Sequence, residues 1–358
     1  MPDQFFGRPT FPLEIDELNW LEDLPKDTYF ALWPCIPSSS NNPINLPLGH
    51  STYVLLFHQE RFDTEWVMSQ AARISEPIIV LCDGSDYDFP FLDNVYFYQY
   101  HSWHEHIHRI IQRFPNQQTR TIKYKISNIC NRITQSKAIV FTALMEYIKR
   151  EELLVKLSDW VELKNVHHWV PTGNSELDGL MSTFQSKWLG KTIAIDEFNN
   201  AIDNNQHVNS NPWQSTYLES ALHFVGESFH YSRMINEFGD VIIPGPSFSE
   251  KLYKCLIAGT PFVPVGQFES YKHLRDLGFE FDYGELDLSW DNDPGNITRM
   301  QGIVNLIKSL ANYTTNDIEL MTRNSTEHNN DYVWSGDFRK KCQDNNEQTA
   351  NKILNKFR

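Results

Sequence analysis

The sequence has few cysteines, no long apolar run and none of three common catalytic motifs. Five cysteines among 358 residues, odd in number and without a Cys-x-x-Cys pair, argue against a disulfide framework and a zinc site. No stretch reaches the roughly 18 consecutive apolar residues that a membrane-spanning helix needs. The absence of G-x-G-x-x-G, Walker A and H-E-x-x-H patterns gives no support to a dehydrogenase, a P-loop kinase or a zinc protease.

Basic residues are also scarce, with 31 Lys and Arg against 46 Asp and Glu. The net charge of -15 opposes nonspecific binding of polyanions over the whole surface. The imbalance is uneven, because the first 105 residues carry four basic and 16 acidic residues, whereas residues 106–150 carry nine basic residues and one acid, Glu146. Something anionic could therefore approach this basic stretch.

Length and composition are those of a folded, enzyme-sized chain. Apolar residues make up 41% and charged residues 22%, which excludes a disordered or collagen-like protein. At roughly 100 to 200 residues per domain, the chain predicts two domains or one large one. The N-terminus has acids where a signal peptide has a basic start and an apolar run. We expect a cytoplasmic protein, located in the host cytoplasm if the source is viral.

Short β-rich runs alternate with turn or helix signals in the first part of the chain. The runs cover residues 29–33, 53–57, 77–81, 95–100 and 121–126. Apolar residues at helical spacing then predict a helix over 136–150. This alternation is typical of βαβ units with a parallel sheet, so we expect an N-terminal Rossmann-like domain over 1–155.

A second α/β series follows. It comprises a strand over 192–195, a helix over 215–224, a strand over 240–243, a helix over 250–258 and a strand at PFVPVG. Ser249 and Gly259 are expected to cap the last of these helices. We expect a C-terminal Rossmann-like domain over 156–330 and a final helix over 331–358 that packs back on the first domain. The predicted fold class is α/β, with two Rossmann-like domains facing a cleft.

The most informative segment begins after a Pro-Gly-Pro loop. Ser249 precedes the helix, and Glu250 and Lys251 occupy its first turn, where free N–H groups and the helix dipole favour an anion. A lysine is electrostatically unfavourable at this end, so its presence is easier to understand if an anionic ligand binds there. The alternative is a solvated lysine paired with Glu250 or Glu227, and local physics does not choose between the two.

Three segments resemble the α1,3-fucosyltransferase family. SEKLYKCLIAGTPFVPVG, from Ser249, resembles its donor-binding signature, which runs Thr-Glu-Lys, helix, Ala-Gly and then Pro-Val-Val with Gly. Upstream, GES at 226–228 resembles the Phe-Glu-Asn-Ser element of that family. YKISNICNRITQSKAIVFTALMEY, from Tyr124, resembles the strand, Ser-Asn, basic residue and helix that open the donor side. The resemblance implies a fold of two Rossmann domains, the GT-B type, with the acceptor bound by the first domain and the donor by the second.

The same resemblance implies a metal-independent hexosyl- or pentosyltransferase that uses a nucleotide-diphosphate sugar and no cofactor. It assigns Lys251 to the diphosphate and Glu250 to ribose or sugar hydroxyls. Arg132 or Lys137, after Asn128, would supply the second cation. Fixed cations and a helix N-terminus stabilise the negative charge that grows on the bridging oxygen as the glycosidic bond breaks. The remaining candidate donor-binding residues are Glu227, Ser228, Tyr231 and Ser249.

An inverting transfer also needs a base for the acceptor hydroxyl, and a carboxylate after a strand of the first domain can serve. Glu60 follows the run at 53–57, and a Glu follows the corresponding strand in fucosyltransferases, so Glu60 is the predicted catalytic base. His58 is a second candidate base and an acceptor contact. Asp83 and Asp86 could bind acceptor hydroxyls after the next strand, or could form an Asp-Gly turn.

The histidine-rich segment HSWHEHIH, residues 101–108, raises the question of a metal site. His104, His106 and His108 would share one face of a strand, but the surrounding sequence predicts a helix, on which only His104 and His108 align. We expect a polar helix face or a lining of the acceptor site, and no metal.

Two alternatives stay open. The first changes the acceptor from a glycan to a hydroxymethylated base of phage DNA, since phage DNA-modifying glucosyltransferases share the two-domain architecture. The basic stretch favours this acceptor, and the net charge of -15 opposes it. The second is a non-catalytic nucleotide-sugar or glycan binding protein that kept the fold and lost the base.

Overall fold

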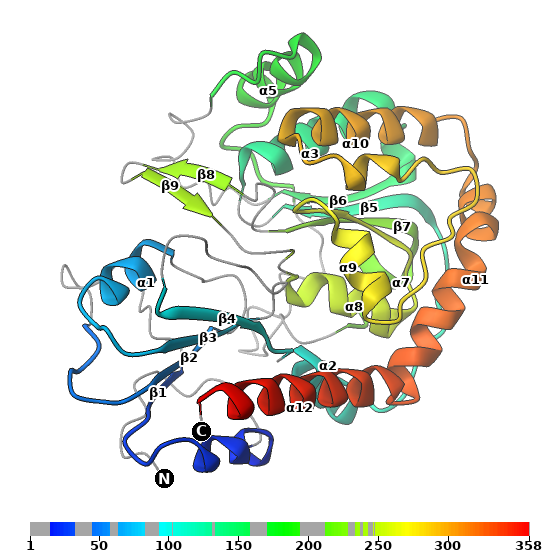
Figure 1. Cartoon of the computed structure of the whole chain (residues 1–358). Helices are drawn as coiled ribbons and strands as arrows, with labels where there is room; N and C mark the ends of the chain where they lie inside the picture. Colours follow the sequence, from blue (N-terminus) through cyan, green and yellow to red (C-terminus); the bar gives the residue numbers. More distant parts are fainter. Residues whose placement is uncertain are drawn as a thin grey trace. The chain divides into compact units, whose positions relative to one another are not determined.

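Two four-stranded parallel sheets organise the chain in the computed structural model (Figure 1). The structure describes residues 15–32, 45–57, 64–82, 93–101, 103–130, 133–157, 170–193, 212–227, 233–236, 239–242, 246 and 248–357. The chain divides into two compact units. Unit 1 comprises residues 1–108, 231–247 and 336–358, and unit 2 comprises residues 109–230 and 248–335. This α/β architecture is compatible with two Rossmann-like domains.

Unit 1 is built on a parallel sheet with strand order β1-β2-β3-β4. The strands are β1 (Tyr29–Leu32), β2 (Tyr53–Phe57), β3 (Ile78–Cys82) and β4 (Val95–Gln99). All four coincide, to within a residue at each end, with predicted runs. Successive side chains of a strand point to opposite faces, so a run that is apolar throughout must be buried on both sides.

Helices bury both faces of this sheet. The covering elements are α1 (Thr64–Ala71) on one face, and η1 (Ile15–Asp23) with α12 (Asp337–Phe357) on the other. Leu55 of β2 belongs to the same apolar cluster as Trp66 of α1. The neighbouring Leu56 packs instead in a cluster with Leu18 of η1 and Ile353 of α12. The alternation of β2 therefore decides which helix each side chain meets.

Three further elements complete the first part of the structure. They are α2 (Trp103–Arg113), which crosses from unit 1 into unit 2, and the antiparallel pair β8 (Arg233–Asn236) and β9 (Gly239–Ile242). A strand over 240–243 was predicted as part of the second α/β series. The structure has it as half of a hairpin in unit 1, and β9 contacts α1 there.

Unit 2 is a sheet whose winding reverses direction. The strand order is β10-β7-β5-β6, and the strands are β5 (Tyr124–Cys130), β6 (Leu153–Leu157), β7 (Ser220–Gly226) and β10 (Phe262–Val265). All neighbouring pairs are parallel. The chain runs outward from β5 to β6 and, in the opposite direction, from β7 to β10. Because crossover connections are right-handed, the helices after β5 and β7 lie on opposite faces.

Figure 1 shows these two faces, with α3 and α10 on one side of the sheet and α8 and α9 on the other. On the first side, α3 (Gln135–Tyr147) packs against α5 (Ser175–Lys187) and α10 (Asn296–Leu310). On the second, α8 (Glu250–Ala258) packs against α7 (Ser215–Leu218) and α11 (Thr315–Trp334). The remaining elements are η2 (Arg150–Glu152), α9 (Ser270–Asp276) and η4 (Ser289–Asn292).

Two further segments differ from the sequence predictions. Residues 215–224 were expected to form a helix, but only the short α7 is helical and the central strand β7 follows it. All seven residues of β7 are buried, and such a run lacks the period of two that marks a half-exposed strand. The run predicted at 121–126 becomes β5, which pairs with β6 and β7. These partners lie in unit 2, which also contains β5 and α3.

Candidate functional site

The carboxyl ends of β5 and β7 mark the point where the winding of the unit 2 sheet reverses. Ligands of open α/β sheets bind outside this point, because the connections leave it in opposite directions. β5 and β7 pair in register from Tyr124 with Ser220 to Asn128 with Phe224. The ends of these two strands are therefore neighbours, and the site begins with the residues that follow them.

The first turn of α8 lies beside the end of β7. Ser249 takes the N-cap position with φ −94° and ψ 169°, but within the described chain its side chain makes no capping hydrogen bond. Its backbone N–H donates to Oε2 of Glu227 at 3.0 Å, and both residues are 1% exposed. In a capping box this acceptor comes from the third helical residue, which here is Leu252. Glu227 substitutes for it from the sheet.

Glu227 is itself fixed to the sheet, since its N–H donates to the carbonyl of Val265 in β10 at 3.2 Å. Lys251, the second residue of α8, is half-buried, and its Nζ donates to Oγ of Ser249 at 3.4 Å. Glu250 is the first residue of the helix. The predicted residues Glu227, Ser249, Glu250 and Lys251 are thus brought together at the start of α8.

Lys137 reaches the same edge from α3. It is the third residue of that helix and is 5% exposed, and its N–H donates to Oγ1 of the N-cap Thr134 at 3.4 Å. Its side chain lies across Gly226, the last residue of β7. A Cβ built on Gly226 would stand 3.0 Å from Cε, 3.1 Å from Cγ and 3.3 Å from Cδ of Lys137. Lys137 therefore contacts the residue that precedes Glu227, the partner of α8.

A buried polar layer lies beneath this edge. Asn128, a predicted donor-binding residue, donates from Nδ2 to the carbonyl of Phe224 at 2.8 Å and accepts from Sγ of Cys130 at 3.3 Å. The bond from Nδ2 joins β5 to β7, whereas the bond to the carbonyl oxygen of the amide stays within β5. Burial raises the pKa of the Cys130 thiol to about 12, against the lowering effect of the Lys137 charge. The thiol is therefore neutral, and this layer supports the site from below.

His223 belongs to the same layer. Its Nδ1 lies 2.6 Å from Oγ of Ser127. Burial, together with the positive charges of Lys251 and the buried Lys254, lowers the pKa of His223 to about 3. The imidazole is therefore neutral near pH 7. The two lysines of α8 therefore act on the imidazole in the same direction as burial does.

Sequence reasoning did not single out Gly226, His223 or Lys254 as site residues. A glycine at the end of a buried strand can mark close approach by another group, and this signal could have pointed to Gly226. No local pattern distinguishes His223 or Lys254 from ordinary core and surface residues. Seven predicted residues lie outside the described residues: Glu60, His58, Asp83, Asp86, Arg132, Ser228 and Tyr231.

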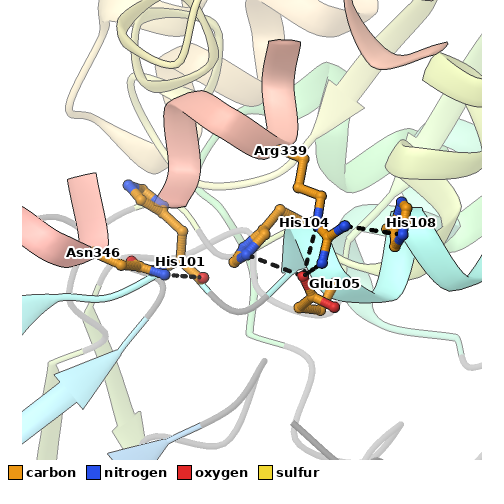
Figure 2. Close-up of polar contacts among 6 residues, drawn as sticks. All are labelled: His101, His104, Glu105, His108, Arg339 and Asn346. Carbon is orange, nitrogen blue, oxygen red and sulfur yellow. Dashed lines mark hydrogen bonds and ion pairs between the residues drawn. The ribbon is translucent and has the colours of Figure 1, made fainter. Parts of the chain in front are cut away.

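The histidine-rich segment is built into the packing of α12 in unit 1 (Figure 2). Arg339 donates to Oε1 of Glu105 from Nε at 2.9 Å and from Nη2 at 2.7 Å. Its Nη1 lies 3.0 Å from Nε2 of His108, and because a guanidinium only donates, this nitrogen accepts. Asn346 exchanges hydrogen bonds of 2.7 and 2.9 Å with the backbone of His101. The polar face of α2 therefore holds the last helix.

Over the described ranges, no group of three or more His, Cys, Asp and Glu side chains is arranged to hold a metal ion. In the same ranges, no helix is both long and apolar enough to cross a bilayer. Comparisons of the chain with models of protein families, with curated proteins and with solved structures found no match.

Proposed function

We propose that this protein is a glycosyltransferase of GT-B type that binds a nucleotide-diphosphate sugar at the edge formed by β7, α3 and α8. One observation carries the proposal. Two helices on opposite faces of one sheet each place a lysine in the first turn, and these turns contact consecutive residues, Gly226 and Glu227. Lys137 is the third residue of α3, and Lys251 is the second residue of α8.

A cation in a first turn is unfavourable for the helix that carries it, because the N-terminal end of the helix dipole is positive. An anion at this edge would gain backbone donors, both dipoles and both lysine charges. A nucleoside diphosphate supplies two adjacent negative groups and suits a site approached by cations from two sides. The resemblance to α1,3-fucosyltransferases, which assigns Lys251 and a cation after β5 to the diphosphate, supports the same ligand.

The proposed reaction is a single displacement at the sugar carbon. The bond between the sugar carbon and the diphosphate oxygen breaks, its electron pair leaves on the diphosphate, and Lys137 and Lys251 stabilise the growing charge without a metal. The acceptor oxygen attacks from the opposite side and inverts the configuration of the sugar carbon. Glu60 takes the proton of the acceptor hydroxyl.

One reason for a DNA acceptor is weaker than the sequence suggests, because three of the nine basic residues of the basic stretch make contacts within unit 2. The buried Lys125 pairs with Glu152 at 2.7 Å, and Lys123 pairs with Glu219 at 2.6 Å. Arg120 donates from Nη2 to a backbone carbonyl, and burial lowers its pKa to about 10. These contacts favour a glycan acceptor over a hydroxymethylated base in duplex DNA.

A thermal-shift panel of GDP, UDP, ADP and CMP and their sugar conjugates tests donor binding. Ligand at about 100 times its Kd stabilises the native state by about 2.7 kcal/mol, a readily measured rise in midpoint. We expect one nucleotide series to raise the midpoint, and Lys137→Ala and Lys251→Ala each to abolish the rise. Lys187→Ala, at an exposed lysine of α5, is the matched control and should keep it.

No rise with any nucleotide, or a rise unchanged in both variants of the site, would overturn the proposal. The variant Glu60→Gln then separates a transferase from a binding protein. It should bind the donor as the wild-type protein does and transfer no sugar. Donor binding by the wild-type protein without transfer or hydrolysis would favour the non-catalytic alternative.

A further inference from the structure

Gly226 is a glycine that its backbone conformation does not require. Its φ lies outside the left-handed region, and it is the last residue of the buried strand β7, where its backbone pairs with Val265 of β10. The reason for glycine must therefore be space. Among the described residues, the three atoms nearest to a Cβ built there are all carbons of Lys137, at 3.0, 3.1 and 3.3 Å.

These distances are shorter than ordinary contacts between carbon atoms, which begin near 3.5 Å. An alanine at this position would have to displace the Lys137 side chain. A lysine on a surface could move aside, but Lys137 is 5% exposed and has little room to do so. The methylene groups of Lys137 thus occupy the place of the missing side chain, and this contact sets the path from α3 to the edge of the sheet.

We propose that Gly226 is a positioning residue for Lys137: its missing side chain lets the lysine lie across the end of β7 and brings the ammonium group to the edge where α8 begins. The role of that ammonium in binding a diphosphate rests on the proposed function. The contact itself does not, so the two claims can be tested apart.

A double-mutant cycle tests the contact without any ligand. Thermal midpoints are measured for the wild-type protein, Gly226→Ala, Lys137→Ala and the double variant. Gly226→Ala should lower the midpoint by a few degrees in the wild-type background, as overpacking does, and by much less when Lys137 is already truncated. Equal losses in both backgrounds would overturn the proposal. If Gly226→Ala alone fails to fold, recovery of folding in the double variant supports it.

Gly179→Ala is the control for the cycle. Gly179 lies in the helix α5 of the same unit, and in the described part of the chain nothing stands within 4 Å of a Cβ built there. This substitution should leave the midpoint unchanged or raise it. A loss as large as that of Gly226→Ala would show that the sheet contact has no special role.

A second readout reports on Lys137 itself. We expect acetic anhydride to acetylate Lys137 at least several-fold faster in Gly226→Ala than in the wild-type protein, measured by mass spectrometry under native conditions. A general loss of stability would raise the acetylation rate of all buried lysines together. The buried Lys125 therefore serves as the internal reference. Equal acceleration at both lysines would overturn the proposal.

The binding of inorganic pyrophosphate then tests whether the ammonium group of Lys137 contributes to anion binding. The affinity for pyrophosphate should fall at least tenfold in Gly226→Ala, and Gly226→Ala should cause no further loss once Lys137 is alanine. If the midpoints show coupling but pyrophosphate binds wild-type protein and Lys137→Ala equally, Gly226 still positions the lysine and the proposed function is wrong.

Discussion

Replacing Arg339 by alanine should destabilise unit 1, because it leaves the carboxylate of Glu105 buried without its partner. The Glu105 side chain is 4% exposed and that of Arg339 is 27% exposed. Two guanidinium nitrogens donate to one carboxylate oxygen, at 2.9 and 2.7 Å. After the substitution, the nearest cation-forming group to that oxygen among the described residues is Nε2 of His104, at 3.5 Å. This contact is too long to replace the guanidinium.

The expected cost follows from burial. Removing one partner of a buried ion pair costs about 3 to 5 kcal/mol, because the other charge stays desolvated. Arg339 is about a quarter exposed, so we take the lower end, about 3 kcal/mol. The pair of Lys187 and Glu146 is the control, with an N–O distance of 2.9 Å and exposures of 57% and 39%. Lys187→Ala should cost no more than about 1 kcal/mol.

Hydrogen exchange localises the effect better than global unfolding, since a chain of two units need not unfold in one step. A loss of about 3 kcal/mol speeds exchange by opening about 100-fold, and we expect this at the amides of α12 (residues 337–357). Replacing both Arg339 and Glu105 by leucine should recover at least half of the loss. If Arg339→Ala and Lys187→Ala cost the same within about 0.5 kcal/mol, burial does not set the strength of the contact.

Three more predictions concern unit 2. Glu227→Ala should cost about 2 kcal/mol, because it leaves the buried N–H of Ser249 without its acceptor, and Glu227→Gln should cost less than half of that; equal costs in urea denaturation would contradict this. The pKa of His223, about 3, lies below its ordinary 6.5, so its stabilising contribution is complete above pH 6.5 and decreases by up to roughly 5 kcal/mol as the pH falls from 6.5 to 3. His223→Gln should make the free energy of unfolding depend less on pH in this range. An NMR signal assigned to the His223 imidazole that titrates near pH 6.5 would refute the prediction. Gly259→Ala should lower the free energy of unfolding by about 1 to 2 kcal/mol, because Gly259 has φ +63° and a Cβ would stand 3.3 Å from Asn330; an unchanged urea midpoint would contradict this.

The strands of unit 1 could be predicted from sequence because each is a short apolar run bounded by turn signals. β2 (Tyr53–Phe57) has its predicted bounds, and its burial on both faces explains why the run is apolar throughout. Burial on both faces is also the reason why the prediction was wrong at β7 (Ser220–Gly226). That run follows the helical turn α7, and without alternation its apolar residues fit a buried helix as well as a buried strand.

Domain membership could not be predicted from local signals. β5 was found as a strand, but a strand signal does not report its partner. Ser127 of β5 pairs with His223 of β7, 96 residues away along the chain. Parallel strands are joined only through long crossovers, so the partner depends on tertiary packing. This is why a strand signal alone does not assign β5 to a sheet.

The α8 side of the site was predictable because its signals are local. Ser249 and Gly259 mark the ends of the helix in the sequence. A lysine at the electropositive end of a helix is unusual and can be recognised without knowledge of the fold. The α3 side depended on the resemblance, which named Lys137 without its surroundings. Its contact with Gly226 exists only because β5 and β7 are neighbours, and a sequence pattern cannot show that.

Three features of this edge are each unfavourable for folding. Lys137 is a cation in the first turn of α3, Lys251 is a cation in the first turn of α8, and Gly226 is a glycine at the end of a central strand, where its loss of backbone freedom costs free energy. Natural sequences agree with their fold at most positions, and conflicts between local preference and structure concentrate at functional sites. Any one of these could be an accident of packing. All three meet at the one point of the sheet where the winding reverses, and an anionic ligand would account for both lysines directly and for the glycine through the path of Lys137.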